Sequence, residues 1–390
     1  MRRLRFIPAV MLGLALAGAS WLYAAPGVRK VRDLVIYGDA RFHCAFPSVV
    51  QRPDGELLVS FRRAPNRLAF GEKDNNHVDP NSYLVGVRSR DSGATWTPTP
   101  ELIYAHAIGG SQDPGLLQLR DGTLLCTSYG WTFMRPDAVS KLKPPFLQII
   151  PGCIFNGGYY LRSTDGGKSW QGPWYPPHLV LEIYHDPYGQ PLPAYNRGAL
   201  AEGRDGRIFW VSACSDQESP RKTSTHLLIS GDQGRTWKYS CPVAVDAKVS
   251  FNETSIYETP QGDLVAFLRI ENLNDEACLA RSVDGGKSFQ PWQGMGFQGH
   301  PPHALRLPDR RVLLTCGYRH APFGIRARIL NAECTDFATA PEIVLREDGG
   351  TTDLGYPWSV QLDAKRVLVT YYFNVGRGLQ HIAGTVLEIQ

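Results

Sequence analysis

Short apolar runs that alternate with polar residues recur along the chain, and turn signals separate them. In most units a small residue or Pro opens one run, an Asp-Gly pair follows seven residues later, and a second apolar run comes next. Alternation with a period of two is typical of half-buried β-strands, and Asp-Gly is a strong signal of a tight hairpin. Six such hairpins are present, and they begin at Pro47, Pro114, Gly198, Thr254, Pro302 and Pro357. The pattern predicts an all-β protein built from six related units.

A second repeat lies between the hairpins. The pattern S-x-D-x-G-x-[ST]-[WF], known as the Asp box, occurs four times, with its aspartates at Asp91, Asp165, Asp232 and Asp284. The aspartate of such a turn can accept hydrogen bonds from its own backbone amides, and the glycine supplies a positive φ. We interpret each copy as the turn of an outer hairpin. The copies lack the repeated carboxylates of an EF-hand, so we do not expect calcium loops.

An inner and an outer hairpin in each unit make a four-stranded antiparallel blade, and six blades make a closed β-propeller. The sixth unit has too little chain after Tyr372 for two full outer strands, but residues 31–38 (VRDLVIYG) can supply the missing one. Closure of this kind leaves no exposed sheet edge. We therefore predict one six-bladed domain over residues 25–390, closed by an N-terminal strand and monomeric.

Residues 1–24 are typical of a secretory signal peptide. Three arginines precede an apolar run from Phe6 to Ala25, and we place the cleavage after Ala24, because cleavage after Ala25 would put Pro26 just past the cut and bulky Tyr23 three residues before it. An uncleaved membrane anchor is the alternative, since the run approaches the roughly 20 residues that span a bilayer. We expect cleavage, no stable membrane anchor, and an exported protein that is periplasmic or secreted.

Charge and cysteine spacing limit the possible ligands. The chain has 41 Lys+Arg against 37 Asp+Glu, and removal of three signal arginines leaves 38 against 37. This balance argues against nucleic acid as a partner, because binding it needs a dominant basic surface. The eight cysteines lack metal-site spacing, so we expect mostly buried thiols and no metal or cofactor.

In a propeller, the residues before each inner strand and after each second strand surround a central funnel on one face. These positions are rich in Arg, acids, His and Tyr. Several arginines that converge with acids indicate either an anionic ligand, since guanidinium groups match carboxylates, or pairing among themselves. The candidates are His43, Arg62, Asp113, Arg197, Glu253, Arg269, His303, Arg319, Asp353 and Tyr356. Insertions at 63–80, 131–158 and 171–195 fall on the same face, and the last two are rich in Pro and aromatic residues that would suit sugar faces.

Three segments resemble the sialidase (neuraminidase) superfamily of Asp-box propellers. Residues 251–269 (FNETSIYETPQGDLVAFLR) are similar to the segment that carries a Glu and an Arg of a carboxylate-binding triad. Residues 353–362 (DLGYPWSVQL) are similar to the segment of the last blade that carries a tyrosine nucleophile. Residues 317–328 are similar to a segment with another triad arginine, which is either Arg319 or Arg326.

The resemblance implies a retaining glycoside hydrolase. Tyr356 would be the nucleophile, and Glu253 would accept its proton, because a tyrosine with a pKa near 10 needs a base. The general acid would come from the insertion after the first hairpin, where Asp79 is the first candidate and His77 the second.

One position departs from the family. Ala45 stands where the family has an arginine two residues before Pro47, so a three-arginine clamp is incomplete unless Arg62 or Arg197 compensates. We therefore expect a glycan or glycoconjugate substrate with a sialic-acid-like or uronic terminal sugar. A polysaccharide lyase or uronate-specific hydrolase, and a non-catalytic glycan-binding propeller, are the alternatives.

Overall fold

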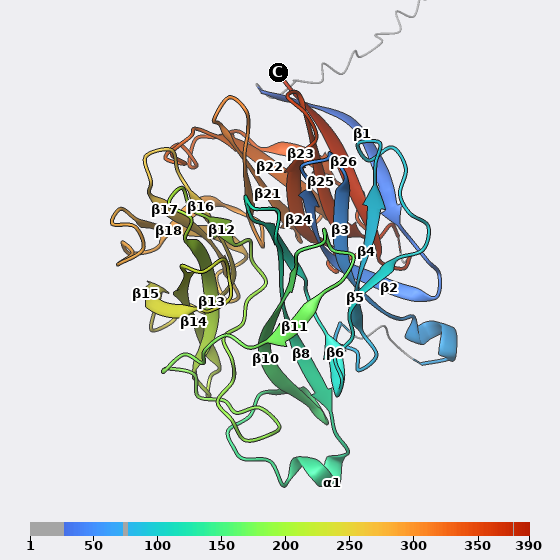
Figure 1. The fold of residues 1–390 in the computed structure, drawn as a ribbon, viewed down its shortest axis with the longest axis vertical. Coiled ribbons are helices and arrows are strands. Elements are labelled where there is room, and N and C mark those ends of the chain that lie inside the picture. The colour runs from blue at the N-terminus through green and yellow to red at the C-terminus, as the bar shows by residue number, and fades with distance from the viewer. Residues whose placement is uncertain (1–26, 73–76, 377) are drawn as a thin grey trace, which may run out of the picture.

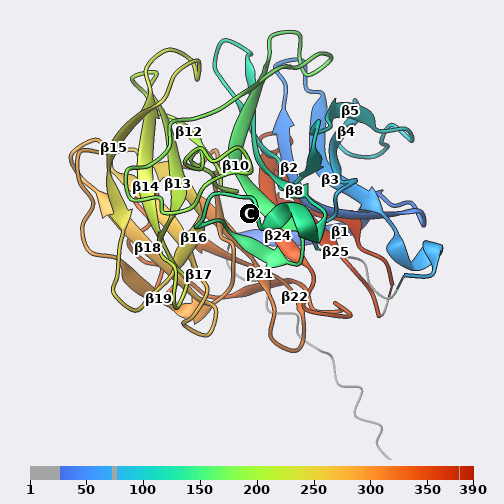
Figure 2. The ribbon, with the colours of Figure 1, turned by 90° about the horizontal axis from the view of Figure 1, so that it is seen from below.

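The computed structural model describes residues 27–72, 77–376 and 378–390, so the predicted signal peptide lies outside the described residues. Six antiparallel sheets follow one another along the chain and surround the middle of the molecule (Figures 1 and 2). Five sheets have four strands, and the second has six because its inner strand is split and an insertion adds a short strand. The predicted six-bladed propeller is confirmed.

The strands are assigned to blades in chain order. The first blade holds β2 (Phe42–Gln51), β3 (Leu57–Pro65), β4 (Tyr83–Ser89) and β5 (Glu101–Tyr104), and the second holds β6 (Gly109–Ser111), β7 (Gly115–Gln118), β8 (Leu124–Phe133), β9 (Gln148–Ile150), β10 (Cys153–Ser163) and β11 (Gln171–Trp174). The third holds β12 (Ala201–Glu202), β13 (Ile208–Gln217), β14 (Lys222–Ser230) and β15 (Lys238–Ala244), and the fourth holds β16 (Phe251–Glu258), β17 (Leu264–Ile270), β18 (Glu276–Ser282) and β19 (Gln293–Gln298). The fifth holds β20 (His303–Arg306), β21 (Val312–Tyr318), β22 (Gly324–Leu330) and β23 (Ile343–Arg346), and the sixth holds β24 (Gly355–Gln361), β25 (Arg366–Phe373), β26 (His381–Ile389) and β1 (Val28–Tyr37).

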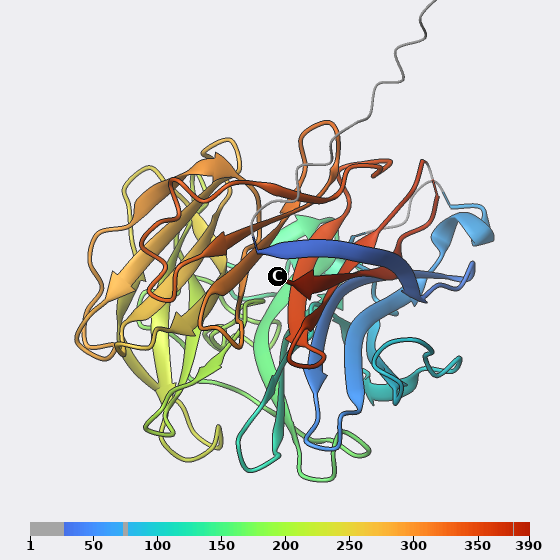
Figure 3. The same cartoon turned by 90° about the horizontal axis from the view of Figure 1, so that it is seen from above.

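The N-terminal strand closes the ring, as predicted. β1 pairs antiparallel with β26 from Val28 opposite Ile389 to Tyr37 opposite Ile382, and it forms the outer edge of the sixth sheet. Figure 3 shows this blue strand beside the red C-terminal strands. The two ends of the described chain therefore complete one blade together.

The four Asp boxes have the hydrogen bonds that their sequence predicts. In the first, Thr95 N and Thr95 Oγ1 donate to the two oxygens of Asp91 over 2.8 and 2.6 Å, and Ser89 Oγ accepts from Gly93 N over 2.8 Å. Gly93 has a φ of 80°, which only glycine adopts readily. These donors lower the pKa of Asp91 to about 2. The other three boxes repeat these bonds, so each Asp box satisfies backbone amides of its own turn with its own side chains.

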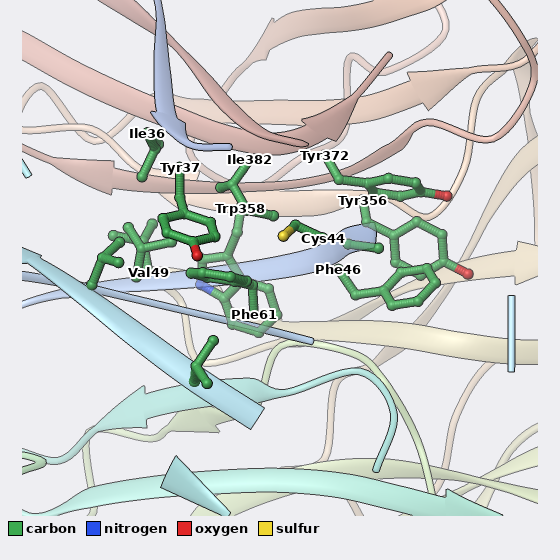
Figure 4. Close-up of a cluster of buried hydrophobic side chains, with 14 of the residues drawn as sticks. Ile36, Tyr37, Cys44, Phe46, Val49, Phe61, Tyr356, Trp358, Tyr372 and Ile382 are labelled. Carbon is green, nitrogen blue, oxygen red and sulfur yellow. The ribbon is translucent and has the colours of Figure 1, made fainter. Parts of the chain in front are cut away.

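Apolar clusters fill the spaces between neighbouring blades. The cluster between the first and sixth blades gathers Ile36, Val49, Phe61 and Trp358 together with the rings that border the candidate site (Figure 4). All eight cysteines are free and buried, as predicted, so no disulfide supports the fold.

The second blade carries the largest insertion. β8 and β10 extend beyond the other strands, and the connection between them bears α1 (Pro136–Val139) at one end of the molecule (Figure 1). A 3-10 helix, η1 (Arg67–Phe70), lies in the insertion of the first blade. In the described part of the chain, no helix is long and apolar enough to cross a membrane.

Substitutions of two neighbouring residues of β1 test whether this strand stabilises the closed ring. Ile36 is 4 % exposed and packs in the cluster between the first and sixth blades, whereas Val35 is 62 % exposed. We expect Ile36→Ala to lower the free energy of unfolding by about 2–5 kcal/mol, and Val35→Ala to change it by less than about 0.5 kcal/mol. Denaturant unfolding measures both, and equal effects would contradict a structural role for β1.

Candidate active site

Tyr356 and Glu253 form the centre of the candidate site, although they come from β24 and β16. The Tyr356 hydroxyl donates to Glu253 Oε1 over 2.8 Å. Arg269 Nη1 lies 2.9 Å from Glu253 Oε2. The Glu253 carboxylate therefore connects the Tyr356 phenol with the Arg269 guanidinium. All three residues were predicted to lie around the central funnel, and the ring of blades brings them into contact.

The backbone of Tyr356 is strained, and Arg197 contacts both its carbonyl oxygen and its ring. Its φ of 54° lies in the left-handed region, which costs a non-glycine residue on the order of 1–3 kcal/mol. Arg197 Nη2 donates to Tyr356 O over 3.3 Å and to Pro47 O over 2.8 Å, and its guanidinium lies 4.6 Å from the Tyr356 ring centroid. Arg197 thus positions Tyr356, and it also lines the floor of the neighbouring cavity.

The surrounding charges keep the Tyr356 proton in place. Burial raises the pKa of Tyr356 far above its usual value, and the nearby Glu253 carboxylate raises it further, while Arg269 opposes this change. The hydroxyl is therefore neutral and donates to Glu253 at rest. Loss of its proton during a reaction requires an acceptor, and Glu253 is already in contact with it.

Two arginines frame the open side of this centre. Arg269 Nε donates to His300 Nδ1 over 3.3 Å, and burial lowers the pKa of His300 to about 2, so this imidazole is a neutral acceptor. Arg319 Nη2 donates to Tyr372 Oη over 3.2 Å, and its guanidinium lies 5.4 Å from the Tyr356 ring. Arg269 and Arg319 are partly exposed and lie where an anionic group could reach them.

Arg326, the alternative to Arg319, lies elsewhere. It extends from β22, pairs with Glu342 over 3.3 Å and stacks 4.5 Å from the Tyr318 ring. Of the two arginines that the sequence left open, only Arg319 lies beside Tyr356.

Asp353, just before β24, contacts one histidine of β2 and another in the insertion of the first blade. Its carboxylate accepts from Tyr372 Oη over 2.9 Å and from Gln380 Nε2 over 2.7 Å. His43 Nε2 lies 3.3 Å from Oδ2, and His77 Nδ1 lies 3.6 Å from Oδ1. Burial alone would raise the pKa of Asp353, but the contacts with the two histidines outweigh it and lower that pKa strongly. The site therefore holds an ionised carboxylate between two histidines.

The other predicted binding residues lie beneath the surface. Arg62 is fully buried, and its three guanidinium nitrogens have no hydrogen-bond partner among the described residues. Asp113 is buried and accepts from Tyr129 Oη over 3.2 Å. His303 is buried, and its ring lies 4.8 Å from that of Trp358. These side chains, like His43, shape the floor of the site and its potential, but solvent does not reach them.

The two candidates for the general acid have different surroundings. Asp79 is buried, and Arg67 Nε and Nη2 donate to its two oxygens over 2.6 and 2.8 Å. His77 is exposed beside Asp353, and its ring contacts Phe46 edge-on at 4.9 Å between centroids. The Phe46 ring is also 4.9 Å from the Tyr356 ring. Figure 4 shows the Phe46, Tyr356 and Tyr372 rings together, with both hydroxyls pointing away from the apolar cluster.

A cavity of about 160 Å³ opens beside Glu253 and Arg269. Its aromatic and apolar wall comes from the insertions, and its polar side includes groups that the sequence did not single out. The lining includes Tyr129, Trp131, Leu147, Ile149, Phe155, Tyr195, Arg221, Asn252 and Glu271. Arg221 and Gln380 both follow the second strand of a blade, so the rule that located Arg269 could have found them as well. The described residues contain no group of three or more side chains arranged to hold a metal ion.

Comparison with known proteins agrees with this architecture. Residues 154–369 match the BNR repeat-like domain family. The chain belongs to this family. A crystal structure of a protein of unknown function from Dyadobacter fermentans is 69 % identical with a TM-score of 0.92, and the match covers 94 % of this chain and all of that one.

More distant structures share the propeller fold. Trypanosoma rangeli sialidase has 14 % identity and a TM-score of 0.62 over 93 % of this chain and 60 % of its own. Penicillium chrysogenum α-L-arabinanase has 15 % identity and a TM-score of 0.62 over 92 % of this chain and 98 % of its own. The chain is thus a sialidase-like BNR propeller, and its chemistry has to be argued from its site.

The buried carboxyl group of Asp113 gives a prediction about how the stability of the protein depends on pH. Burial and the nearby Glu253 raise the pKa of Asp113 well above its usual range. The unfolded state then loses the proton at a lower pH than the folded state, so this group makes stability fall as pH rises from about 4 towards neutrality. We expect the unfolding free energy of Asp113→Asn, relative to wild type, to increase between pH 4 and pH 8.

Chemical denaturation at several pH values measures this difference. Asp137→Asn, at an exposed aspartate of α1, is the control and should give no such trend. A difference between Asp113→Asn and wild type that stays constant with pH would contradict the assignment.

Proposed function

We propose that this protein is an exported, monomeric glycoside hydrolase that removes an acidic terminal sugar from a glycan or glycoconjugate with retention of configuration. The observation that carries the proposal is the hydrogen bond of 2.8 Å from Tyr356 to Glu253, beside two partly exposed arginines. A neutral phenol that already contacts a base is an arrangement suited to nucleophilic catalysis. Similarity to sialidases supports the proposal only at the level of the fold.

In the proposed reaction, Tyr356 Oη attacks the anomeric carbon while its proton passes to Glu253. The strained backbone and the contact with Arg197 hold the ring in place, so little freedom is lost on reaching the transition state. A neutral nucleophile also suits an anionic substrate, because a carboxylate in its place would be repelled by the charge of the sugar.

Arg269 and Arg319 would bind the acidic group of the sugar, and the aromatic wall of the cavity would contact the sugar ring or its neighbour. The clamp holds two arginines and the Asp353 carboxylate instead of three arginines. This charge pattern favours a ligand with one carboxylate and hydroxyl groups that can donate to Asp353. Uronic acids and sialic-acid-like sugars both meet these conditions.

Tyr356→Phe tests the nucleophile. The ring and its contacts remain, but no covalent bond to the sugar can form, so we expect kcat on aryl glycosides of uronic or sialic acids to fall by more than about 10³-fold. The matched control is Tyr371→Phe, because the Tyr371 hydroxyl bonds Thr385 in the interior of the same blade. Sugar binding without turnover in the wild type would instead indicate a glycan-binding propeller.

Arg319→Met tests the anion clamp. Loss of a charge-assisted hydrogen bond costs about 1.5–3 kcal/mol, so we expect KM for the acidic sugar to rise about 10- to 100-fold. Arg328→Met is the control, since Arg328 pairs with Glu342 on the outer part of the fifth blade. An unchanged KM for Arg319→Met would remove the clamp from the proposal.

A further inference from the structure

A retaining glycosidase needs a group that gives a proton to the departing oxygen, and two carboxylic acids near Tyr356 are poorly placed for it. Asp79 is buried, and its oxygens accept from Arg67 and from Asn81 N. Both oxygens thus already have donors, so a glycosidic oxygen would have to displace Arg67 to reach one of them. Asp113 is buried under Tyr129 and is 1 % exposed, so a glycosidic oxygen cannot approach it.

His77 has the opposite properties. Its side chain is 54 % exposed, and its Nδ1 faces Asp353 Oδ1 at 3.6 Å. Nε2, on the other side of the ring, has no hydrogen-bond partner among the described residues, so it is available to a ligand. The ring contacts the same Phe46 side chain that Tyr356 contacts, which places His77 at the mouth of the site.

The carboxylate that faces His77 is itself fixed. Tyr372 Oη and Gln380 Nε2 donate to Asp353 at 2.9 and 2.7 Å, and Arg319 Nη2 donates to Tyr372 Oη at 3.2 Å. A continuous chain of polar contacts therefore runs from an arginine of the anion clamp through Tyr372 and Asp353 to His77.

We propose that His77 is the general acid and base of the reaction and that Asp353 is its positioning residue. The inference rests on the proposed function and deepens it, because it assigns a group to the leaving-group side of the sugar. An imidazole oriented by a carboxylate through one nitrogen can exchange a proton through the other.

The proposed reaction has two steps. In the first, the bond between the anomeric carbon and the leaving-group oxygen breaks, that oxygen takes a proton from protonated His77, and Tyr356 Oη bonds to the carbon as its own proton passes to Glu253. In the second, water attacks the same carbon and gives a proton to neutral His77, and Tyr356 departs and recovers its proton from Glu253. The overall change is hydrolysis of one glycosidic bond.

Leaving-group dependence separates this role from a structural one. An aryl group with an acidic phenol departs without proton transfer, whereas a weakly acidic phenol or an alkyl alcohol needs it. For His77→Ala in the full chain, we expect kcat to fall by about 10²-fold or more on the poorest leaving groups. On dinitrophenyl glycosides of the same acidic sugar we expect kcat to change only a few-fold.

Related variants complete the experiment. His77→Gln should behave like His77→Ala, because an amide can bond Asp353 but cannot donate a proton as an acid. Asp353→Asn should give the same leaving-group dependence with a smaller loss. His178→Ala, at an exposed histidine in the insertion after β11, should match wild type on every substrate, and thermal melting verifies that each variant is folded.

Each result decides between the proposals. If His77→Ala slows all leaving groups equally, or slows none, His77 is not the acid. If Asp79→Asn or Asp113→Asn instead gives the dependence on the leaving group, that carboxyl takes the role. In all these cases the proposal of a glycoside hydrolase still holds, provided that the wild-type protein hydrolyses the glycosides and the Tyr356→Phe variant does not. A wild type that hydrolyses none of the glycosides overturns both proposals.

Discussion

The antiparallel pairing of β1 with β26 joins the two ends of the described chain, and the position of every candidate residue depends on it. Without this pairing the sixth sheet would lack its outer strand and the ring would have an open edge. β24 of that sheet carries Tyr356, and β2 of the next blade carries His43 and Phe46. Closure therefore brings the nucleophile candidate from near the end of the chain against residues from its beginning.

Burial of charge is the second constraint on this site. Arg62 and Arg197 are almost completely enclosed, and a buried guanidinium is costly unless acids compensate for it. For Arg62, the compensation comes from the charges of Asp113, Asp79 and Asp353. These acids act at a distance, since none of them accepts a hydrogen bond from the Arg62 guanidinium. Asp113 also raises the pKa of Tyr356, so a charge in the floor of the site acts on the candidate nucleophile as well.

The comparisons place the fold within a group whose named structures include a sialidase and an arabinanase. Because these proteins share only about one residue in seven with this chain, they establish the propeller and leave the substrate open. The particular charges of this chain are more informative. The Asp353 carboxylate lies between His43 and His77, and Tyr372 connects it to Arg319, so a negative group and a positive group stand close together in this site.

The sequence by itself determined the six hairpins, the four Asp-box turns and the closing strand. These features arise from alternation of side chains and from turn chemistry, which are local properties of the chain. It also located Tyr356, Glu253 and Arg269, because a position at the start of an inner strand or at the end of a second strand specifies which face of the ring a residue occupies.

Only the tertiary structure showed that Arg319, and not Arg326, lies beside Tyr356, and that Asp79 is paired with Arg67 whereas His77 is exposed. Arg319 follows β21 at the funnel, whereas Arg326 lies within β22 and turns towards Glu342. Asp79 and His77 are two positions apart in one insertion, yet Arg67 pairs with the first and Asp353, 276 residues away, faces the second. Such partners come from distant parts of the chain, and no local pattern reveals which side chain will be neutralised by a partner and which will remain available to a ligand.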